Sequence, residues 1–162
     1  MKIQADKYLY NEVLKYLGKY PATKKKIKEY LKKKIQNKRT YQKVIYPENI
    51  DKNLLVDDIL FKLDELGIID ESSYLESMFN YYQQSLFSIR KIKNKLFLKG
   101  FDQNKIDEFI ELQLQENPEM EIDIIKKYII KKKLKGLEAT TLKKKLYQQY
   151  FSENSIFKVI KN

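Results

Sequence analysis

The chain has 162 residues, enough for one compact domain or a short array of small helical units. It carries 33 Lys and Arg against 22 Asp and Glu, a formal net charge of +11, and has no histidine and no cysteine. These absences exclude disulfides, thiol catalysis and the usual zinc ligands, and they fit a reducing compartment, so we expect a cytoplasmic protein.

The N-terminal residues Met1–Lys7 form no apolar signal-peptide core, and no apolar run reaches 18 residues, so we expect no membrane partner. The positive charge favours a polyanionic partner, either nucleic acid or an acidic protein surface. A mixture rich in Lys, Ile, Asn and Tyr is also typical of an AT-rich genome, so charge alone does not decide between a binding function and genome composition.

Apolar spacings of three and four residues recur along the whole chain, which predicts an all-α fold. Gly and Pro residues fall between these periodic segments, where helices end or begin. The expected helices span residues 5–17, 23–36, 48–66, 71–85, 88–99, 103–116, 118–135, 138–150 and 153–161. A loop is expected before Pro47, because proline disfavours helix in the residue that precedes it.

An internal repeat relates these helices in groups of three. An offset of 50 residues aligns Leu96 with Leu146, Phe101 with Phe151 and Ile106 with Ile156. An offset of 65 aligns Ile27 with Ile92 and also Leu9 with Tyr74. The difference of 15 residues predicts an insertion at about residues 37–51.

Three tandem three-helix repeats are therefore expected to form an elongated, curved helical array. Their predicted boundaries are 1–69, 70–117 and 118–162, with the insertion lying in the first repeat. The role of this insertion is left open between a specific contact and a disordered spacer.

The second helix of every repeat is basic, whereas the third helices of the first two repeats lean acidic. In-register stacking would place the basic helices on one side and the acidic helices on another. The candidate residues for contact with a partner or with DNA are Lys25, Lys28, Lys32, Arg90, Lys91, Lys93, Lys95, Lys99, Lys143, Lys144 and Lys145. Arg39 and Arg90 are the only arginines, and a surface dominated by lysine favours point-charge contact with phosphate or carboxylate over base reading. Tyr30, Phe97 and Tyr147 lie near these helices, but their helical spacing favours packing over base stacking.

No catalytic, cofactor or metal site is expected. The sequence has no phosphate-cradling glycine loop. Asp57, Asp58, Asp64 and Glu65 would suit a magnesium-dependent nuclease, but acidic residues on a helix more often form a solvated face. The sequence therefore predicts a binding protein rather than an enzyme.

Two segments resemble the bacterial RecX regulatory proteins. Residues 67–74, Gly-Ile-Ile-Asp-Glu-Ser-Ser-Tyr, are similar to that family's Gly-hydrophobic-hydrophobic-Asp-Asp…Tyr-Ala pattern. Ile89-Arg90 and Leu96, followed by Lys99-Gly100-Phe101, resemble its Ile-Arg…Leu…Lys-Gly-Ile/Phe segment. The chain departs from the family pattern at Glu71, Leu75 and Gln149-Tyr150, the last pair standing where Arg-Gly is usual.

The resemblance implies three tandem three-helix repeats and a function in DNA repair, recombination and the SOS response. RecX-like proteins bind the RecA recombinase, lie along the groove of its filament on single-stranded DNA, and suppress ATP hydrolysis, filament extension and strand exchange. It implies a monomer that reaches single-stranded DNA through the filament. The alternative is a stand-alone helical protein that binds DNA without sequence specificity, whose affinity would fall steeply with salt.

Overall fold

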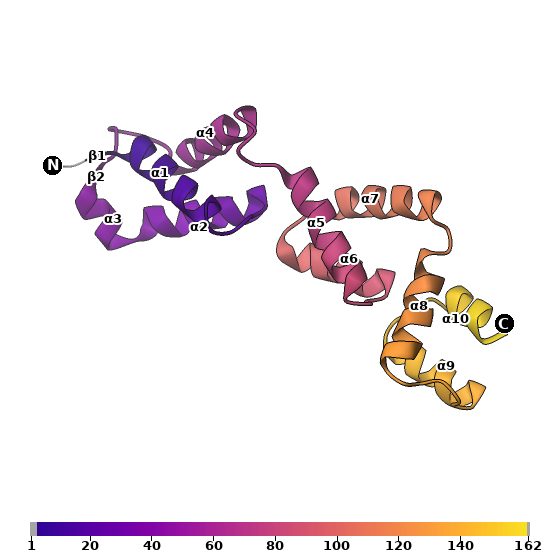
Figure 1. Cartoon of the computed structure of the whole chain (residues 1–162). Helices are drawn as coiled ribbons and strands as arrows, with labels where there is room; N and C mark the ends of the chain where they lie inside the picture. Colours follow the sequence, from indigo (N-terminus) through magenta and orange to yellow (C-terminus); the bar gives the residue numbers. More distant parts are fainter. Residues whose placement is uncertain (1–2, 162) are drawn as a thin grey trace. The chain divides into compact units, whose positions relative to one another are not determined.

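The computed structural model describes residues 3–161 and confirms the all-α fold, with ten helices in that range (Figure 1). They are α1 Ala5–Leu17, α2 Lys24–Gln36, α3 Lys38–Lys43, α4 Lys52–Glu65, α5 Glu71–Gln84, α6 Ile89–Lys99, α7 Gln103–Glu116, α8 Met120–Lys131, α9 Ala139–Gln148 and α10 Glu153–Lys161. No helix within this range is long and apolar enough to cross a bilayer.

The chain forms two compact units, Met1–Tyr74 and Leu75–Asn162. The predicted boundaries of the three repeats, and the elongated, curved array, stay predictions. Unit 1 contains α1 to α4 and the first residues of α5, and unit 2 contains the rest of α5 and α6 to α10.

The insertion of unit 1 is folded as far as Ile45, and Tyr46 lies outside the helices and strands, as expected of the residue before Pro47. It contains α3 and the strand β2, Val44–Ile45, which pairs in parallel with β1, Ile3–Gln4. The Asn37 side chain accepts a hydrogen bond from the Arg39 amide and so caps α3. Thr40 and Val44 are only 4% and 3% exposed, so burial of these two side chains anchors the segment.

Leu9, Ile27, Leu31, Val56 and Leu63 are fully buried and form the centre of the unit 1 core. The buried residues of α1 match those of α5 at an offset of 66 rather than the expected 65, since Leu9 corresponds to Leu75 and Val13 to Phe79. The connection before α2 is longer than the one before α6, which accounts for the shift of one residue.

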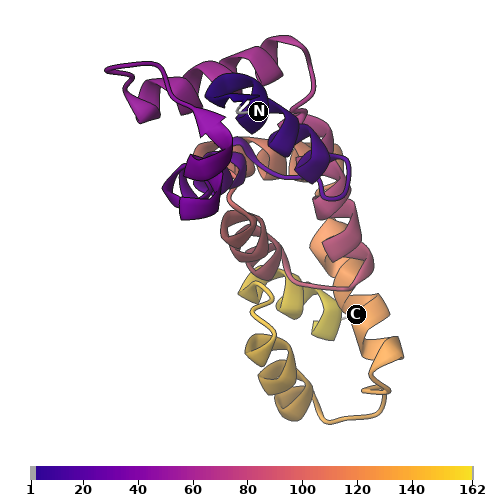
Figure 2. The same cartoon turned by 90° about the vertical axis from the view of Figure 1, so that its left-hand side faces the viewer.

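The helices fall into a first triplet (α1, α2 and α4), a second triplet (α5–α7) and a third triplet (α8–α10). The offset of 50 relates buried residues of the second and third triplets. Leu75 and Ile125 are buried at matching positions in α5 and α8, as are Leu96 and Leu146 in α6 and α9. Figures 1 and 2 both show α10 beside α8 and α9, the two helices against which it packs. Phe101, Ile106 and their equivalents Phe151 and Ile156 are likewise buried, as predicted.

Helix termini follow the predicted capping chemistry with two exceptions. Asp102 and Ser88 accept hydrogen bonds from amides in the first turns of α7 and α6. Gly100 has a left-handed backbone with φ of 99°, whereas Gly18 remains in the right-handed helical region with φ of −64°. The predicted start of α8 at Pro118 is also wrong, because residues 118–119 form a turn and the helix begins at Met120.

Candidate interaction surface

Helix α6 is the most basic helix of unit 2, and three of its predicted contact lysines, Lys91, Lys93 and Lys95, are engaged within the unit. The Lys93 ammonium lies 2.7 Å from an Asp107 carboxylate oxygen on α7. Lys91 donates to Gln149 Oε1 at 2.7 Å, and Lys95 lies 4.7 Å from the centre of the Phe87 ring. These contacts fix the lysine stems, so α6 presents ordered rather than freely rotating charge.

Arg90 is exposed at the edge of this surface, and its guanidinium lies 5.5 Å from the Tyr150 ring centre. The Lys91 ammonium lies 5.7 Å from the same ring. Cations within about 6 Å of an aromatic face are attracted by its quadrupole, with roughly 0.5–1 kcal/mol at exposed sites. Tyr150 therefore joins α6 to the end of α9, whereas the sequence marked it only as a departure from the RecX-like pattern.

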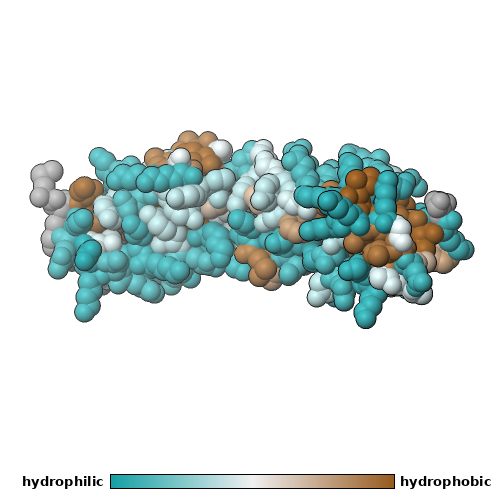
Figure 3. All heavy atoms as spheres, turned by 60° about the horizontal axis from the view of Figure 1, so that its bottom comes forward, coloured by the Kyte–Doolittle hydropathy of each residue, from teal (hydrophilic) through white to brown (hydrophobic). Residues whose placement is uncertain are grey.

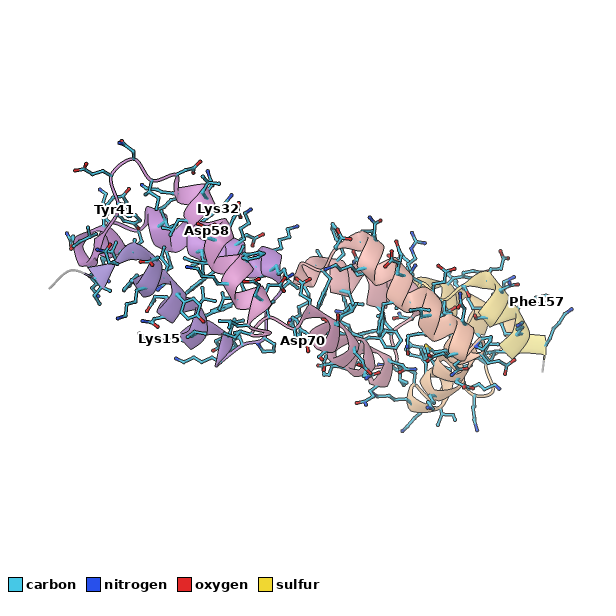
Figure 4. All side chains as sticks on the ribbon, turned by 90° about the horizontal axis from the view of Figure 1, so that it is seen from above. Lys15, Lys32, Tyr41, Asp58, Asp70 and Phe157 are labelled. Carbon is cyan, nitrogen blue, oxygen red and sulfur yellow. The ribbon has the colours of Figure 1, made fainter. Side chains whose placement is uncertain are left out.

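Helix α2 in unit 1 pairs its lysines with the acidic helix α4. Lys28 lies 2.6 Å from Asp57, and Lys24 lies 2.7 Å from Asp64. Lys25 and Lys32 are exposed, and Figure 4 labels Lys32. Tyr30 stacks on Tyr16 with 4.6 Å between ring centres, which agrees with its predicted packing role.

The Lys28–Asp57 and Lys93–Asp107 pairs occupy equivalent positions in their triplets. Lys93 follows Lys28 by 65 residues and Asp107 follows Asp57 by 50, the two offsets found in the sequence. Hydrogen bonds from Lys93, and then from Gln103, hold the pKa of Asp107 below its ordinary value. Such exposed pairs stabilise only slightly, but they neutralise the positions where they form.

These pairs change the expected separation of charge. Basic second helices and acidic third helices are not isolated from each other, because cross-helix ion pairs join them in both places just described. Exposed positive charge on α2 and α6 is carried by residues outside these pairs, such as Lys32 and Arg90.

Helix α9 keeps its three predicted lysines, Lys143, Lys144 and Lys145, exposed. None of the three forms an ion pair with any residue between 3 and 161. The position 50 residues after Asp107 is Phe157, so Lys143 has no equivalent acid, and its ammonium lies 5.7 Å from the Tyr147 ring centre instead. The third triplet therefore presents the least neutralised of the three basic helices.

A buried carboxylate joins the two triplets of unit 2. Glu121 in the first turn of α8 is 8% exposed and accepts hydrogen bonds from the Ile89 amide at 3.3 Å and the Ser152 amide at 3.3 Å. The Ser152 hydroxyl also donates to it. Glu121 thereby links the start of α6 to the start of α10. Sequence reasoning did not select this residue, although Glu71 and Glu121 match at the offset of 50 and could have indicated it.

Glu121 and Arg90 also border a cavity of about 730 Å³, together with apolar residues of both triplets. Its lining includes Leu114, Ile122 and Phe151. Among residues 3–161, no group of three or more acidic side chains is arranged to hold a metal ion.

No protein-family model matches the sequence, and comparison with curated proteins found no match. Two solved structures share the fold. The chain matches the crystal structure of RecX from Lactobacillus salivarius with a TM-score of 0.70 and 20% identity, over 97% of this chain and 95% of that one. It matches a second crystal structure, of regulatory protein RecX, with a TM-score of 0.68 and 24% identity, over 97% of this chain and 71% of that one.

Proposed function

We propose that this chain is a RecX-like regulator that binds the RecA filament and inhibits it. The observation that carries the proposal is the agreement of fold with two RecX structures over 97% of the chain. The RecX-like segment at residues 67–74 supports it independently, because that resemblance rests on the order of side chains and not on the path of the backbone.

In this proposal the chain acts without catalysis, as a monomer in the cytoplasm. It lies in the groove of the RecA filament and reaches single-stranded DNA through the filament. The exposed lysines of α2, α6 and α9 face acidic RecA surface and nearby phosphate, where Coulomb attraction steers binding and fixes the register. Bridging of successive RecA subunits then suppresses ATP hydrolysis, filament extension and strand exchange.

The best test reverses one exposed lysine on each basic helix: Lys32→Glu, Lys99→Glu and Lys145→Glu in one variant. Reversing Lys91, Lys93 and Lys95 would instead break contacts inside unit 2. The readouts are RecA ATP hydrolysis on single-stranded DNA and co-sedimentation with the filament. We expect the concentration for half-inhibition to rise by about tenfold or more, since rim charges mainly set association rate and salt dependence.

A matched control reverses three exposed lysines outside the basic helices, Lys62, Lys126 and Lys127, for the same change in net charge. This control should inhibit like the unchanged chain. Equal inhibition by both variants would contradict the proposed surface. Binding to single-stranded DNA that is equally tight without RecA would favour the stand-alone DNA-binding alternative.

A further inference from the structure

The start of α9 is open, whereas the equivalent start of α6 is met by the first turn of α8. Thr140 and Lys143 of α9 follow Arg90 and Lys93 of α6 by 50 residues. On α6, Ile89, Arg90 and Lys93 border the open cavity described above, together with residues of α8 and α10. The α9 face, in contrast, borders a shallow hollow lined by Thr140, Lys143, Lys144, Tyr147 and Gln148.

Two other basic helices of the chain, α6 and α2, show what contacts such a helix start. In unit 2, Glu121 in the first turn of α8 accepts a hydrogen bond from the amide of Ile89, the first residue of α6. In unit 1, Glu71 in the first turn of α5 accepts one at 2.7 Å from the amide of Lys24, the first residue of α2. In each case a helix with a carboxylate in its first turn meets the start of a basic second helix, where the dipole favours negative charge.

The start of α9 has no such partner among residues 3–161. Ala139 is the equivalent first residue, and no side chain in that range accepts a hydrogen bond from its amide. The N-cap residue Glu138 makes no side-chain capping bond either. The lysines at 143 and 144 lack ion pairs within the described chain, as shown above. The start of α9 thus keeps its lysine charge, whereas the starts of α2 and α6 each donate an amide hydrogen bond to a glutamate.

Apolar side chains complete the face. Leu137 and Tyr147 are each 38% exposed. Figure 3 shows apolar residues gathered over the third triplet among hydrophilic neighbours. An apolar patch rimmed by lysines is typical of a surface that binds protein rather than solvent.

We propose that this face, formed by Leu137, Ala139, Thr140, Lys143, Lys144 and Tyr147, binds an amphipathic helix of another protein. That helix carries a carboxylate in its first turn, followed by apolar residues, as α5 and α8 do. The carboxylate accepts from the Ala139 amide and pairs with Lys143 or Lys144, and the apolar residues cover Leu137 and Tyr147. The proposal does not depend on RecA being the partner.

The test uses a fluorescein-labelled synthetic peptide of residues 70–84, which contains Glu71 and no basic residue, and the full chain. We expect saturable binding by fluorescence anisotropy. Lys143→Glu with Lys144→Glu should weaken it by about tenfold or more, because truncating or reversing a charge-assisted contact costs at least about 1.4 kcal/mol. The Glu71→Gln peptide should bind the unchanged chain several-fold more weakly. Lys126→Glu with Lys127→Glu on α8 is the matched control and should bind normally.

Amide chemical shifts identify the site. Shifts confined to residues 137–148 support the proposal. Shifts centred on Lys24 would mean that the peptide competes with Glu71 at α2, and they would overturn it. Absence of peptide binding would also overturn the proposal. So would shifts of the α9 amides caused by an oligothymidylate but not by the peptide, since the face would then bind nucleic acid.

Discussion

Replacing Glu121 by alanine tests how the two triplets of unit 2 are held together. The substitution removes the acceptor for the Ile89 and Ser152 amides and for the Ser152 hydroxyl. Hydrogen bonds to charged groups contribute about 1.5–3 kcal/mol each in favourable cases, but both amide contacts here are long at 3.3 Å. We therefore expect the free energy of unfolding of unit 2 to fall by about 2–3 kcal/mol in total.

Glu121→Gln keeps one carbonyl acceptor and should lower the same free energy by only about 1 kcal/mol. The measurement is urea unfolding of the full chain followed by circular dichroism, combined with hydrogen exchange of the Ile89 and Ser152 amides as a local readout. Glu119→Ala is the control, since Glu119 is exposed and its side chain makes no capping bond. A loss below about 0.5 kcal/mol for Glu121→Ala, or one equal to that of Glu119→Ala, would refute the assigned role.

Two other predictions concern unit 1 and the core. The pKa of Glu12 lies below its ordinary value chiefly because Lys34 donates a hydrogen bond to it at 2.5 Å. The ionised Glu12 carboxylate therefore stabilises the folded chain at neutral pH, and this contribution is lost as pH falls through the folded-state pKa of Glu12. Lys34→Met should raise that pKa in an NMR titration and reduce the acid sensitivity of stability, whereas Lys15→Met, which breaks a 3.4 Å exposed pair, should change it little. In the core, Leu96→Ala should lower the free energy of unfolding, measured in urea, by about 2–4 kcal/mol, because Leu96 is fully buried. Leu98→Ala should lower it by less than about 0.5 kcal/mol, because Leu98 is 68% exposed. Equal losses would contradict the assigned packing.

The sequence was sufficient for the core because helical periodicity and the repeat constrain the same residues. Leu96 and Leu146, or Ile106 and Ile156, are buried in the structure at positions that both signals selected. The offset failed by one residue in α1, where Leu9 matches Leu75, because a connecting loop of different length absorbs the shift without changing helix periodicity.

The insertion and the ion pairs were beyond sequence reasoning for a different reason. Burial of Thr40 and pairing of Val44 with Ile3 are contacts between segments far apart in the chain, and a two-residue strand has no periodicity to detect. Likewise, Lys28 and Lys93 have the sequence pattern of an open basic stripe. Their neutralisation by Asp57 and Asp107 depends on which helix faces pack together.

The departure from the RecX-like pattern at Gln149-Tyr150 acquires a physical meaning from these contacts. Tyr150 stands 50 residues after Gly100 and also has a left-handed backbone, with φ of 63°, which costs a non-glycine residue about 1–2 kcal/mol. In return, its ring contacts Arg90 and Lys91.

Gln149 adds two hydrogen bonds to this junction, one from Ser88 to its backbone oxygen and one from Lys91 to its side chain. Glycine at position 150 would relieve the strain but lose the ring that orders two cations of the proposed surface. At position 150 the third triplet thus has a strained backbone and contacts that hold α6 in place, whereas the second triplet has a glycine at the equivalent position 100. The third triplet has also exchanged the acid of the equivalent ion pair for Phe157, which leaves Lys143 available to a partner. Both differences bear on the proposed surfaces, since Tyr150 contacts the cations of α6 and Lys143 of α9 keeps no ion pair within residues 3–161.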